Sequence, residues 1–474
     1  MRMAGRGMRI SFAAVLIMAL STAAPVWGQT LQTYDVPPAL QYTAHNDDFT
    51  VQVRSENGEW KDLYEWNVRV DHDRPQDASM VYFDFTGKVE LRIQKNNGNF
   101  SKVNIGPRND APRPIIRDDK VYISLDHPQN FAVFFDDDRL HNLHVFAGAP
   151  IPAPQGENVR RFGPGLHVPE GGGGVFNVKS DETVYLEGGA VLRGTFRVDN
   201  AHNVRIVGHG LILPPAGEDG AQFLVVKSQN VSIQGLIVTQ ADAGVGRSVM
   251  SKDIRFSDIK GITGGRWTDG INIYSSERVS LDRLFLRTSD DCVTVYTHRD
   301  EIYGDSRDIS VTNSTLWADV AHAMFIGVHG NTIKPEIIEN VRFDNIDVVN
   351  VDEDDPDYEG VMSIMAGDSN LVQDISFSNI RVDRIEEAKL FQFRVMLNQK
   401  YNTSPGRGIK RVTLRNVSYT GEGMPSASLI SGYDELRGID DIRLENVTIG
   451  GRKIDIDNPT VLKIGPFARN IRTQ

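Results

Sequence analysis

A short alternation of polar and apolar residues recurs through the second half of the chain. Each copy starts with a polar residue, followed by Val or Ile, another polar residue and another apolar one. The nine copies begin at Asn203, Asn230, Asp253, Arg278, Asp308, Asn340, Asp374, Arg411 and Asp441, 23–37 residues apart. A period of two indicates β-strands, and regular recurrence at this length indicates a solenoid in which each copy adds one unit.

The repeat favours a right-handed parallel β-helix. A leucine-rich repeat would need a fixed Leu pattern and helices, and a propeller needs about 40–50 residues per blade. Asn also occupies the sixth place of the later copies, at Asn313, Asn345, Asn379, Asn416 and Asn446. In stacked coils these side chains are expected to superpose as a ladder at a turn, bonded to one another or to the backbone.

The first third of the chain follows a different pattern. Alternating runs without a common period predict strands at Phe49–Arg54, Met80–Phe85, Val89–Ile93, Val121–Leu125 and Phe131–Phe135. These features predict an N-terminal β-sandwich over residues 29–150. A Pro- and Gly-rich linker is expected over 151–174, followed by the β-helix over 175–474. The fold class is therefore all-β.

The N-terminal residues 1–28 have the pattern of a signal peptide. Arg2, Arg6 and Arg9 precede an apolar run from Ile10 to Leu20, and small residues allow cleavage before Gln29. The alternative is a short anchor left in place, although the run is too short to span a bilayer. We expect export to a bacterial periplasm or medium, because a secreted chain with one cysteine has no intrachain disulfide.

Composition narrows the possible partners. Among 474 residues, 51 Lys and Arg oppose 63 Asp and Glu, giving a net charge of −12 without a basic block. Such a chain is a poor candidate for binding nucleic acid, and no membrane partner is expected after signal cleavage. The lone Cys292 is expected to pack in the core, and no cofactor motif or metal site is predicted.

Three carboxylates fall in two successive repeats. Asp269 precedes Asp290 and Asp291 by 21 and 22 residues, close to the local coil length, and His322 follows in the next coil. Stacked coils can bring these side chains together on one wall, provided that a bulge or strand end presents both neighbouring aspartates outward. Repulsion should raise at least one pKa. A protonated acid beside an ionised one suits glycoside cleavage; the alternative is that the acids bind calcium or cap turns.

The motifs around these residues resemble the polygalacturonase family, glycoside hydrolase family 28. The matching segments are T-D-G at Asp269, D-D-C at Asp290 to Cys292, and H-x-x-x-x-G from His322 to Gly327. A sandwich before the helix is also similar to the dextranase and isopullulanase family, glycoside hydrolase family 49. The resemblance implies an inverting hydrolase in which Asp290 is the general acid and Asp269 and Asp291 activate water, with His322 supporting the trio. The carboxyl separation would be ~6.5–9.5 Å.

One departure from that family concerns the substrate. Its members carry an R-I-K segment one coil beyond the histidine, whose cations hold the galacturonate carboxylate. Here the corresponding stretch is Gly360–Met365, without a cation; Arg394 in the next coil could substitute, but nothing in the sequence requires it. We therefore expect a neutral α-linked or unusual glycan, dextran-like, rather than plain polygalacturonan.

Further candidates flank the motifs. Trp267, Tyr296 and Trp317 could stack on sugars or pack between loops, and His298 and Arg299 could line a subsite. The acidic loop 352–357 is expected to be solvated, with calcium binding as its alternative. Two other functions remain open: a non-catalytic glycan-binding adhesin, and a polysaccharide lyase, which would want calcium and a basic residue.

Overall fold

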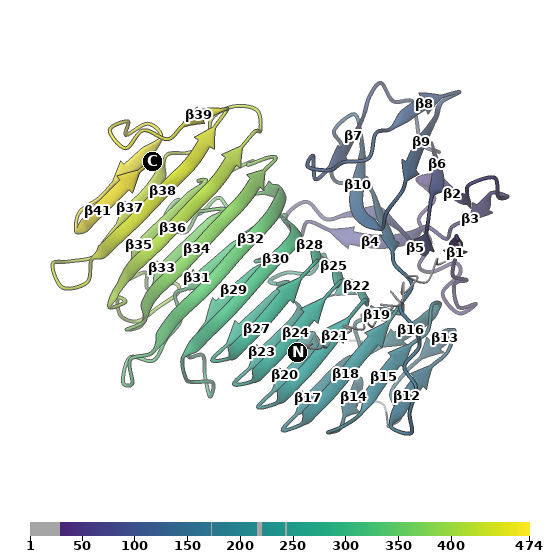
Figure 1. Ribbon diagram of the computed structural model, residues 1–474, viewed down its shortest axis with the longest axis horizontal. Helices are drawn as coiled ribbons and strands as arrows, with labels where there is room; N and C mark the ends of the chain where they lie inside the picture. Colours follow the sequence, from purple (N-terminus) through teal and green to yellow (C-terminus); the bar gives the residue numbers. More distant parts are fainter. Residues whose placement is uncertain (1–28, 172, 216–219, 242–243) are drawn as a thin grey trace, which may run out of the picture.

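The computed structural model describes residues 29–171, 173–215, 220–241 and 244–474. The predicted signal peptide lies outside these described residues. Within them, the strands form four sheets and no residue is in an α-helix, so no helix could cross a membrane. Figure 1 shows the long coiled stack from teal to yellow, with the N-terminal sheets in purple and blue beside its first coils.

Sheets C and D form a parallel β-helix, as predicted. Sheet D contains β14 (Val175–Val178), β17 (Thr195–Asp199), β20 (Ala221–Val226), β23 (Gly244–Val249), β26 (Ile271–Tyr274), β29 (Val293–Tyr296), β31 (Met324–Gly327), β33 (Met362–Ala366), β35 (Phe391–Val395), β37 (Ser428–Ser431) and β40 (Leu462–Ile464). Its strands are stacked in that order, so consecutive coils are neighbours in space.

Sheet C carries the remaining strands of each coil. It contains β12 (Val159–Phe162), β13 (Gly165–His167), β15 (Thr183–Leu186), β16 (Ala190–Arg193), β18 (His202–Gly208), β19 (Leu211–Leu213), β21 (Gln229–Gln234), β22 (Ile237–Ala241), β24 (Lys252–Ser257), β25 (Lys260–Thr263), β27 (Glu277–Asp282), β28 (Phe285–Thr288), β30 (Ser306–Ala318), β32 (Ile337–Val351), β34 (Leu371–Val382), β36 (Gly408–Tyr419), β38 (Ile439–Ile449), β39 (Arg452–Lys453) and β41 (Ala468–Thr473). β12 and β13 lie in the stretch expected as a linker, yet they pair with β15 and β16. Local composition shows the turns there but not this pairing with later coils.

The nine repeat copies are stacked in register. Their second residues are aligned from Val204 to Ile442 through every intervening coil. The first residue of every copy has a φ of 53–58°. Asn and Asp tolerate this left-handed conformation better than most residues, which explains why seven of the nine copies begin with one of them. The recurring polar residue therefore forms a corner of each coil.

The predicted asparagine ladder is present, with one interruption. Asn345 donates to Asn313 at 2.8 Å, Asn416 to Asn379 at 3.0 Å, and Asn446 to Asn416 at 3.0 Å. Asn379 instead donates to Asp344, at 2.8 Å. Inside the coils, apolar side chains form one continuous core that includes Cys292.

The first domain is a sandwich of two sheets. Sheet A contains β1 (Thr30–Gln32), β4 (Trp66–Val70), β5 (Gln76–Thr86), β7 (Val103–Gly106), β10 (Gln129–Phe135) and β11 (Leu143–Gly148); sheet B contains β2 (Phe49–Ser55), β3 (Lys61–Asp62), β6 (Val89–Lys95), β8 (Ile115–Arg117) and β9 (Lys120–Leu125). All five strand predictions in this region overlap an observed strand. The pairing is antiparallel except between β5 and β11, and the inner faces share their own apolar core.

A second apolar cluster joins the two domains. Trp66, Val68 and Val70 of β4 pack with Ile237 and Ile262 of the β-helix, and β4 lies across β22 and β25. A buried apolar contact of this kind fixes the relative position of two domains. The turn after β4 is thereby held beside the corners at which β25 and β28 end.

Candidate active site

The predicted aspartates lie at equivalent corners of adjacent coils. Asp269 lies between β25 and β26, and Asp290 and Asp291 lie between β28 and β29. Ile271 is in register with Val293, and Val293 with Met324. The residues two positions before them, Asp269, Asp291 and His322, thus occupy one column. Asp290 and Asp291 can both face outward because β28 ends before them, at Thr288. This meets the condition set by the sequence, that a bulge or a strand end must lie at this point.

The motif glycines allow the corners to stack closely. A Cβ on Gly270 would lie 2.2 Å from the carbonyl oxygen of Cys292, in the next coil. Gly327 has a φ of 103°, and its Cβ would lie 2.4 Å from the carbonyl oxygen of Met365. Any larger residue would push the coils apart at the site.

The three carboxyl groups are close together. Asp269, Asp290 and Asp291 each offer an oxygen within 4.8 Å of the others. This closest approach is shorter than the ~6.5–9.5 Å expected for an inverting pair. The fold gives the reason, since corners of neighbouring coils are about one strand spacing, ~4.8 Å, apart. The same distances would allow a cation to bind, although it would have to displace the protons that burial favours here.

Burial and mutual repulsion raise two of the carboxyl pKa values. The pKa of Asp269 is raised to about 7, by burial first and then by Asp291, while a 2.6 Å hydrogen bond from Asn272 opposes the shift. The pKa of Asp290 is raised well above its usual value by burial and then by both other aspartates. The predicted raised pKa is therefore present, and Asp290 can hold a proton for donation.

His322 supports Asp291 from within the protein. Its Nδ1 donates to Asp291 Oδ1 at 2.7 Å, and its Nε2 donates to the carbonyl of Tyr358. Burial opposes protonation of this ring, but Asp291 and then Glu353, 4.0 Å away, raise its pKa overall. Because both ring nitrogens face acceptors, the ring is an imidazolium that gives Asp291 a counter-charge. His322 is fully buried, so its contact with the trio is made from inside the protein, through Asp291.

The aromatic candidates divide into exposed and buried side chains. Trp267 is 63 % exposed and lies two residues before Asp269. Tyr296 is buried and donates its hydroxyl to Asp291 Oδ2 at 3.3 Å, so it cannot stack on a sugar. Trp317 is fully buried beneath the Arg287 guanidinium, 3.7 Å from its ring centroid. Of the two alternatives open for these rings, packing inside the protein holds for both Tyr296 and Trp317.

The three charged candidates make different contacts. Arg299 donates to the Tyr274 hydroxyl at 3.3 Å, and it acts electrostatically on Asp269. His298 is half-buried, with its backbone N–H on Glu336. Arg394 forms a 3.0 Å ion pair with Asp357, so it is not free to replace the missing clamp. Asp357 belongs to the acidic loop 352–357, where Asp354, Pro356 and Asp357 are exposed, as expected, while Asp352 and Asp355 form ion pairs with Arg74 and Lys400.

Several residues of the site carried no signal in the sequence analysis. Arg247 in β23 is in register with Asn272, and its positive charge lowers the pKa of Asp269. Its buried Nε has no hydrogen-bond partner among the described residues. Glu353 has a pKa raised to about 7, mainly by burial. The register one coil upstream of Asn272, which bonds Asp269, would have pointed to Arg247, whereas Glu353 reaches the site through a loop.

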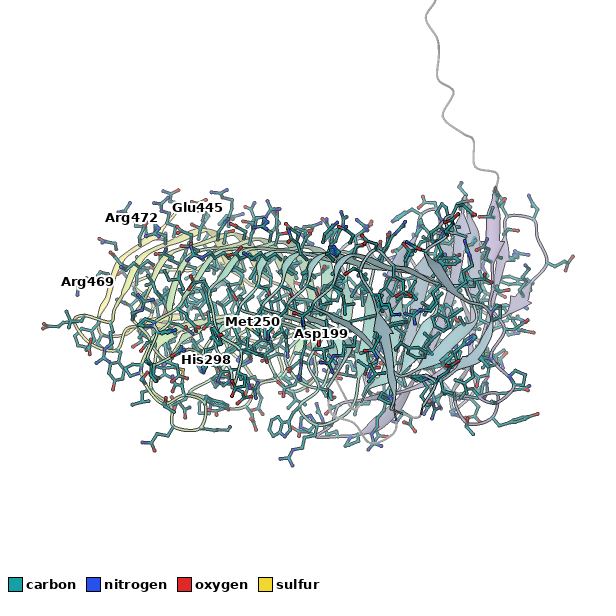
Figure 2. The ribbon with its side chains drawn as sticks, turned by 90° about the horizontal axis from the view of Figure 1, so that it is seen from below. Asp199, Met250, His298, Glu445, Arg469 and Arg472 are labelled. Carbon is teal, nitrogen blue, oxygen red and sulfur yellow. The ribbon has the colours of Figure 1, made fainter. Side chains whose placement is uncertain are left out.

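The site lies on the side of the β-helix formed by sheet D. In Figure 2, Met250 and His298, which follow β23 and β29, lie on one side of the molecule, and Glu445 of sheet C lies on the opposite side. The trio lies against this sheet, because Asn272 of β26 donates to Asp269 and Tyr296 of β29 donates to Asp291.

A carboxyl group that can hold a proton beside neighbouring carboxylates is the arrangement that glycoside hydrolases use, and here a parallel β-helix carries it at one corner. The sequence profile of the glycosyl hydrolases family 28 matches residues 215–463, more than half of the chain. The chain therefore belongs to this family and is a glycosidase. No curated protein sequence matches it.

One solved structure, Dex49A, shows the same fold at low sequence identity, and two others align with lower TM-scores. Dex49A from Penicillium minioluteum has a TM-score of 0.58 and 14 % identity, over 94 % of this chain and 96 % of that one. A polygalacturonase from Erwinia carotovora ssp. carotovora has a TM-score of 0.45 and 12 % identity, over 71 % and 90 %. The family 28 exopolygalacturonase of Yersinia enterocolitica has a TM-score of 0.41 and 11 % identity, over 86 % and 98 %. Dex49A aligns over nearly the whole chain, including the sandwich.

Proposed function

We propose that the protein hydrolyses an α-linked polysaccharide with inversion, using Asp290 as general acid and Asp269 with Asp291 as general base. The observation that carries this proposal is the asymmetry of the trio. Burial and two carboxylate neighbours favour a proton on Asp290, whereas Asp291 is bound to the His322 imidazolium. One group is thus suited to donate a proton and another to accept one.

In the proposed hydrolysis, one proton is given to the leaving oxygen and one is taken from the attacking water. Asp290 gives its proton to the glycosidic oxygen as the bond from the anomeric carbon to that oxygen breaks. Water attacks the same carbon from the opposite face, and its proton goes to the Asp269 and Asp291 pair. Transfer of that proton through solvent restores Asp290. Asp291 is a poor attacking group, because its oxygens accept bonds from His322 and Tyr296.

For the substrate, we propose a neutral or unusual α-linked glycan. The coil that would hold a carboxylate clamp reads Gly360–Met365, and the cations of the next coil are already paired, Arg394 with Asp357 and Lys389 with Glu359. Arg247 and Arg299 place positive charge near Asp269, where both lower its pKa, so the substrate panel must include uronic acid polymers. We also propose export to the periplasm or medium, on the N-terminal pattern alone.

The test compares the wild type with Asp290→Asn on neutral and pectic polysaccharides, scored by new reducing ends. We expect activity in the wild type and a loss of at least about 10³-fold in the variant. Asp119→Asn, an exposed turn residue with a φ of 58°, is the matched control and should match the wild type. NMR of the first product should show the inverted anomer.

Other outcomes point to the rival functions. Products with a new double bond, detected by their ultraviolet absorbance, would show that the protein is a lyase that cleaves by elimination and not a hydrolase. Tight binding to a polysaccharide without any product, in wild type and variant alike, would make the protein a glycan-binding adhesin.

A further inference from the structure

The turn after β4 brings a histidine of the sandwich to the catalytic corner. The Nδ1 of His72 donates to the carbonyl of Ser289 at 3.0 Å. That carbonyl belongs to the peptide bond that leads into Asp290. The His72 ring also lies beside Trp267, with ring centroids 5.9 Å apart. One side chain of the N-terminal domain therefore contacts both the segment before Asp290 and the loop before Asp269.

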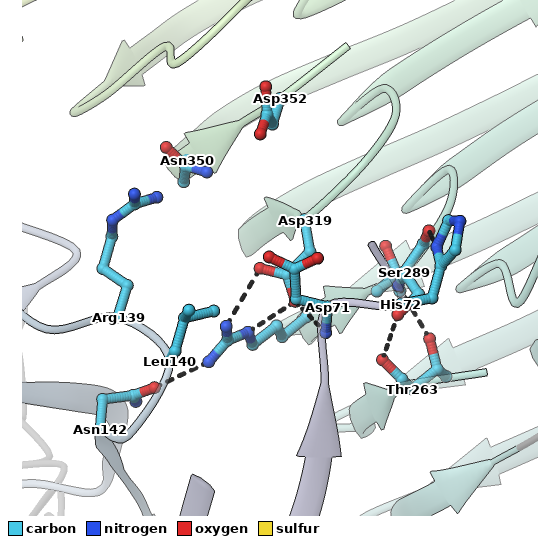
Figure 3. Close-up of polar contacts among 12 residues, drawn as sticks. Asp71, His72, Arg139, Leu140, Asn142, Thr263, Ser289, Asp319, Asn350 and Asp352 are labelled. Atoms are coloured by element: carbon cyan, nitrogen blue, oxygen red, sulfur yellow. Dashed lines mark hydrogen bonds and ion pairs between the residues drawn. The ribbon is translucent and has the colours of Figure 1, made fainter. Parts of the chain in front are cut away.

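The turn that carries His72 is held rigidly. Asp71 has a φ of 53°, and its Oδ1 accepts the backbone N–H groups of Asp73 and Arg74 at 3.1 and 3.0 Å. Its own N–H donates to Asp319 Oδ2 at 3.2 Å. Figure 3 shows Asp71 and His72 side by side, each directed at a different strand end of the β-helix.

A buried ion pair connects the same strand ends to the sandwich. Arg287 donates to both oxygens of Asp319, at 2.9 and 3.1 Å, and to Asn142 Oδ1 of the sandwich at 2.7 Å. Arg287 is fully buried, and burial lowers its pKa, whereas burial raises that of Asp319. A charge pair this deep is stable only with its hydrogen bonds complete, and the sandwich supplies one of them (Figure 3).

Ser289 is fixed from the β-helix side as well. Its N–H donates to Thr263 Oγ1 and its hydroxyl donates to the Thr263 carbonyl, both at 3.1 Å. Ser289 is fully buried. Its carbonyl would thus be left without this donor if His72 were removed, and the peptide group could rotate toward another one.

We propose that the sandwich is part of the catalytic unit, and that His72 is a positioning residue that fixes the Ser289–Asp290 peptide group relative to the Asp269 loop. This inference rests on the proposed role of Asp290. A displacement of about 1 Å in a reacting group can cost on the order of 10²-fold in rate. The side chain therefore acts on turnover, through Asp290, and not on the affinity for substrate.

The test uses the full-length protein and a pair of variants that differ in one property. His72→Asn keeps a donor near the position of Nδ1, and His72→Leu keeps apolar bulk without a donor. We expect His72→Leu to lower kcat by about 30–100-fold with KM changed less than about 3-fold. His72→Asn should recover kcat to within about 5-fold of the wild type.

A control removes a different hydrogen bond between the domains. Asn109 donates to Asp347 at 3.3 Å on the exposed side of the interface, and Asn109→Ala should leave kcat and KM unchanged. The positioning role is overturned if His72→Leu turns over like the wild type. It is also overturned if His72→Asn is as impaired as His72→Leu, or if KM carries the loss. A wild type that releases no reducing ends would instead refute the proposed function.

Discussion

The Nδ1 of His322 lies 2.7 Å from Asp291 Oδ1, and the same oxygen accepts the His322 backbone N–H at 3.1 Å. The histidine lies one coil after the aspartate, so the stacking of the β-helix itself creates the pair. Its ring is enclosed by Phe325 and Tyr358, with centroids 4.6 and 4.9 Å away. This enclosure excludes water and keeps the counter-charge on Asp291 fixed.

Loss of this pair should weaken both catalysis and folding. His322→Ala leaves the Asp291 carboxylate buried without its cation, and we expect kcat to fall about 10²-fold. The free energy of unfolding should fall by roughly 3–5 kcal/mol, measured by urea denaturation. His202→Ala, at an exposed position of β18, should change neither value. Normal kcat in His322→Ala would show that Asp291 does not need its partner.

The pH dependence of activity should show the raised carboxyl pKa values. Asp290 must be protonated to donate, so activity falls as the pH rises through its pKa, which burial, Asp269 and Asp291 raise well above the usual range. On the acid side, activity falls as the base protonates. We expect kcat/KM to be retained near pH 7, and both limbs to belong to the coupled trio. A profile that collapses above about pH 5 would contradict the acid role of Asp290.

The same burial predicts a stability change for Asp269→Asn. The pKa of Asp269 is raised from 3.8 to about 7 in the fold, so the protonated carboxyl favours folding in acid. That contribution is lost as the pH rises from about 4 through 7. The neutral amide avoids this loss, and we expect Asp269→Asn to be more stable by roughly 1–2 kcal/mol at pH 8, with little change at pH 4. Urea denaturation at the two pH values measures the difference, and equal effects at both would contradict it.

Trp267 should act in substrate binding. Its exposed ring, covered on one side by Arg266 at 4.9 Å, is suited to stack on a sugar face. We expect Trp267→Ala to raise KM about 5–30-fold on long substrates while kcat stays within a factor of about 3. Tyr42→Ala, at a site 87 % exposed on the sandwich, is the control. Steady-state kinetics should be measured on the polymer and on short oligosaccharides. Loss of stacking would raise KM mainly for the polymer, whereas a structural effect would change the kinetics of both substrates equally.

Gly270 should tolerate no side chain. The added methyl of Gly270→Ala would meet the Cys292 carbonyl at 2.2 Å, so the coils must separate at the trio. We expect a loss of roughly 2–4 kcal/mol in the free energy of unfolding, together with lower kcat. Gly173→Ala, where a Cβ meets nothing within 4 Å, should be neutral. Wild-type melting of Gly270→Ala would show that the corner can relax.

Much of the β-helix could be predicted from local pattern. The polar residue that opens each copy adopts the left-handed conformation, and the alternation after it fixes which side chains enter the core. Both are properties of a few neighbouring residues, which is why the repeat from Asn203 to Asp441 was predicted correctly. For Asp290 and Asp291 the sequence required a bulge or a strand end, and the structure shows a strand end. The coil length was enough to bring Asp269 and His322 to the same corner.

The sequence could not show which side chains near the site are buried by contacts with distant parts of the chain. For Tyr296 and Trp317 the sequence left stacking on sugars and packing between loops open, and the fold decided for packing, against Asp291 and beneath Arg287 respectively. The spacing of the carboxyl groups likewise followed from the distance between coils and not from the mechanism that the family resemblance suggested.

The sequence by itself determined the repeat, the sandwich, the carboxylate trio and its family, because period, turn residues and motif spacing are local. Only the tertiary structure decided that His322 is buried behind Asp291, that Arg394 is paired with Asp357, and that His72 of the sandwich reaches Ser289. Each of these depends on which surfaces meet when separate coils and domains pack. Such contacts join residues far apart in the chain, and no short-range pattern encodes them.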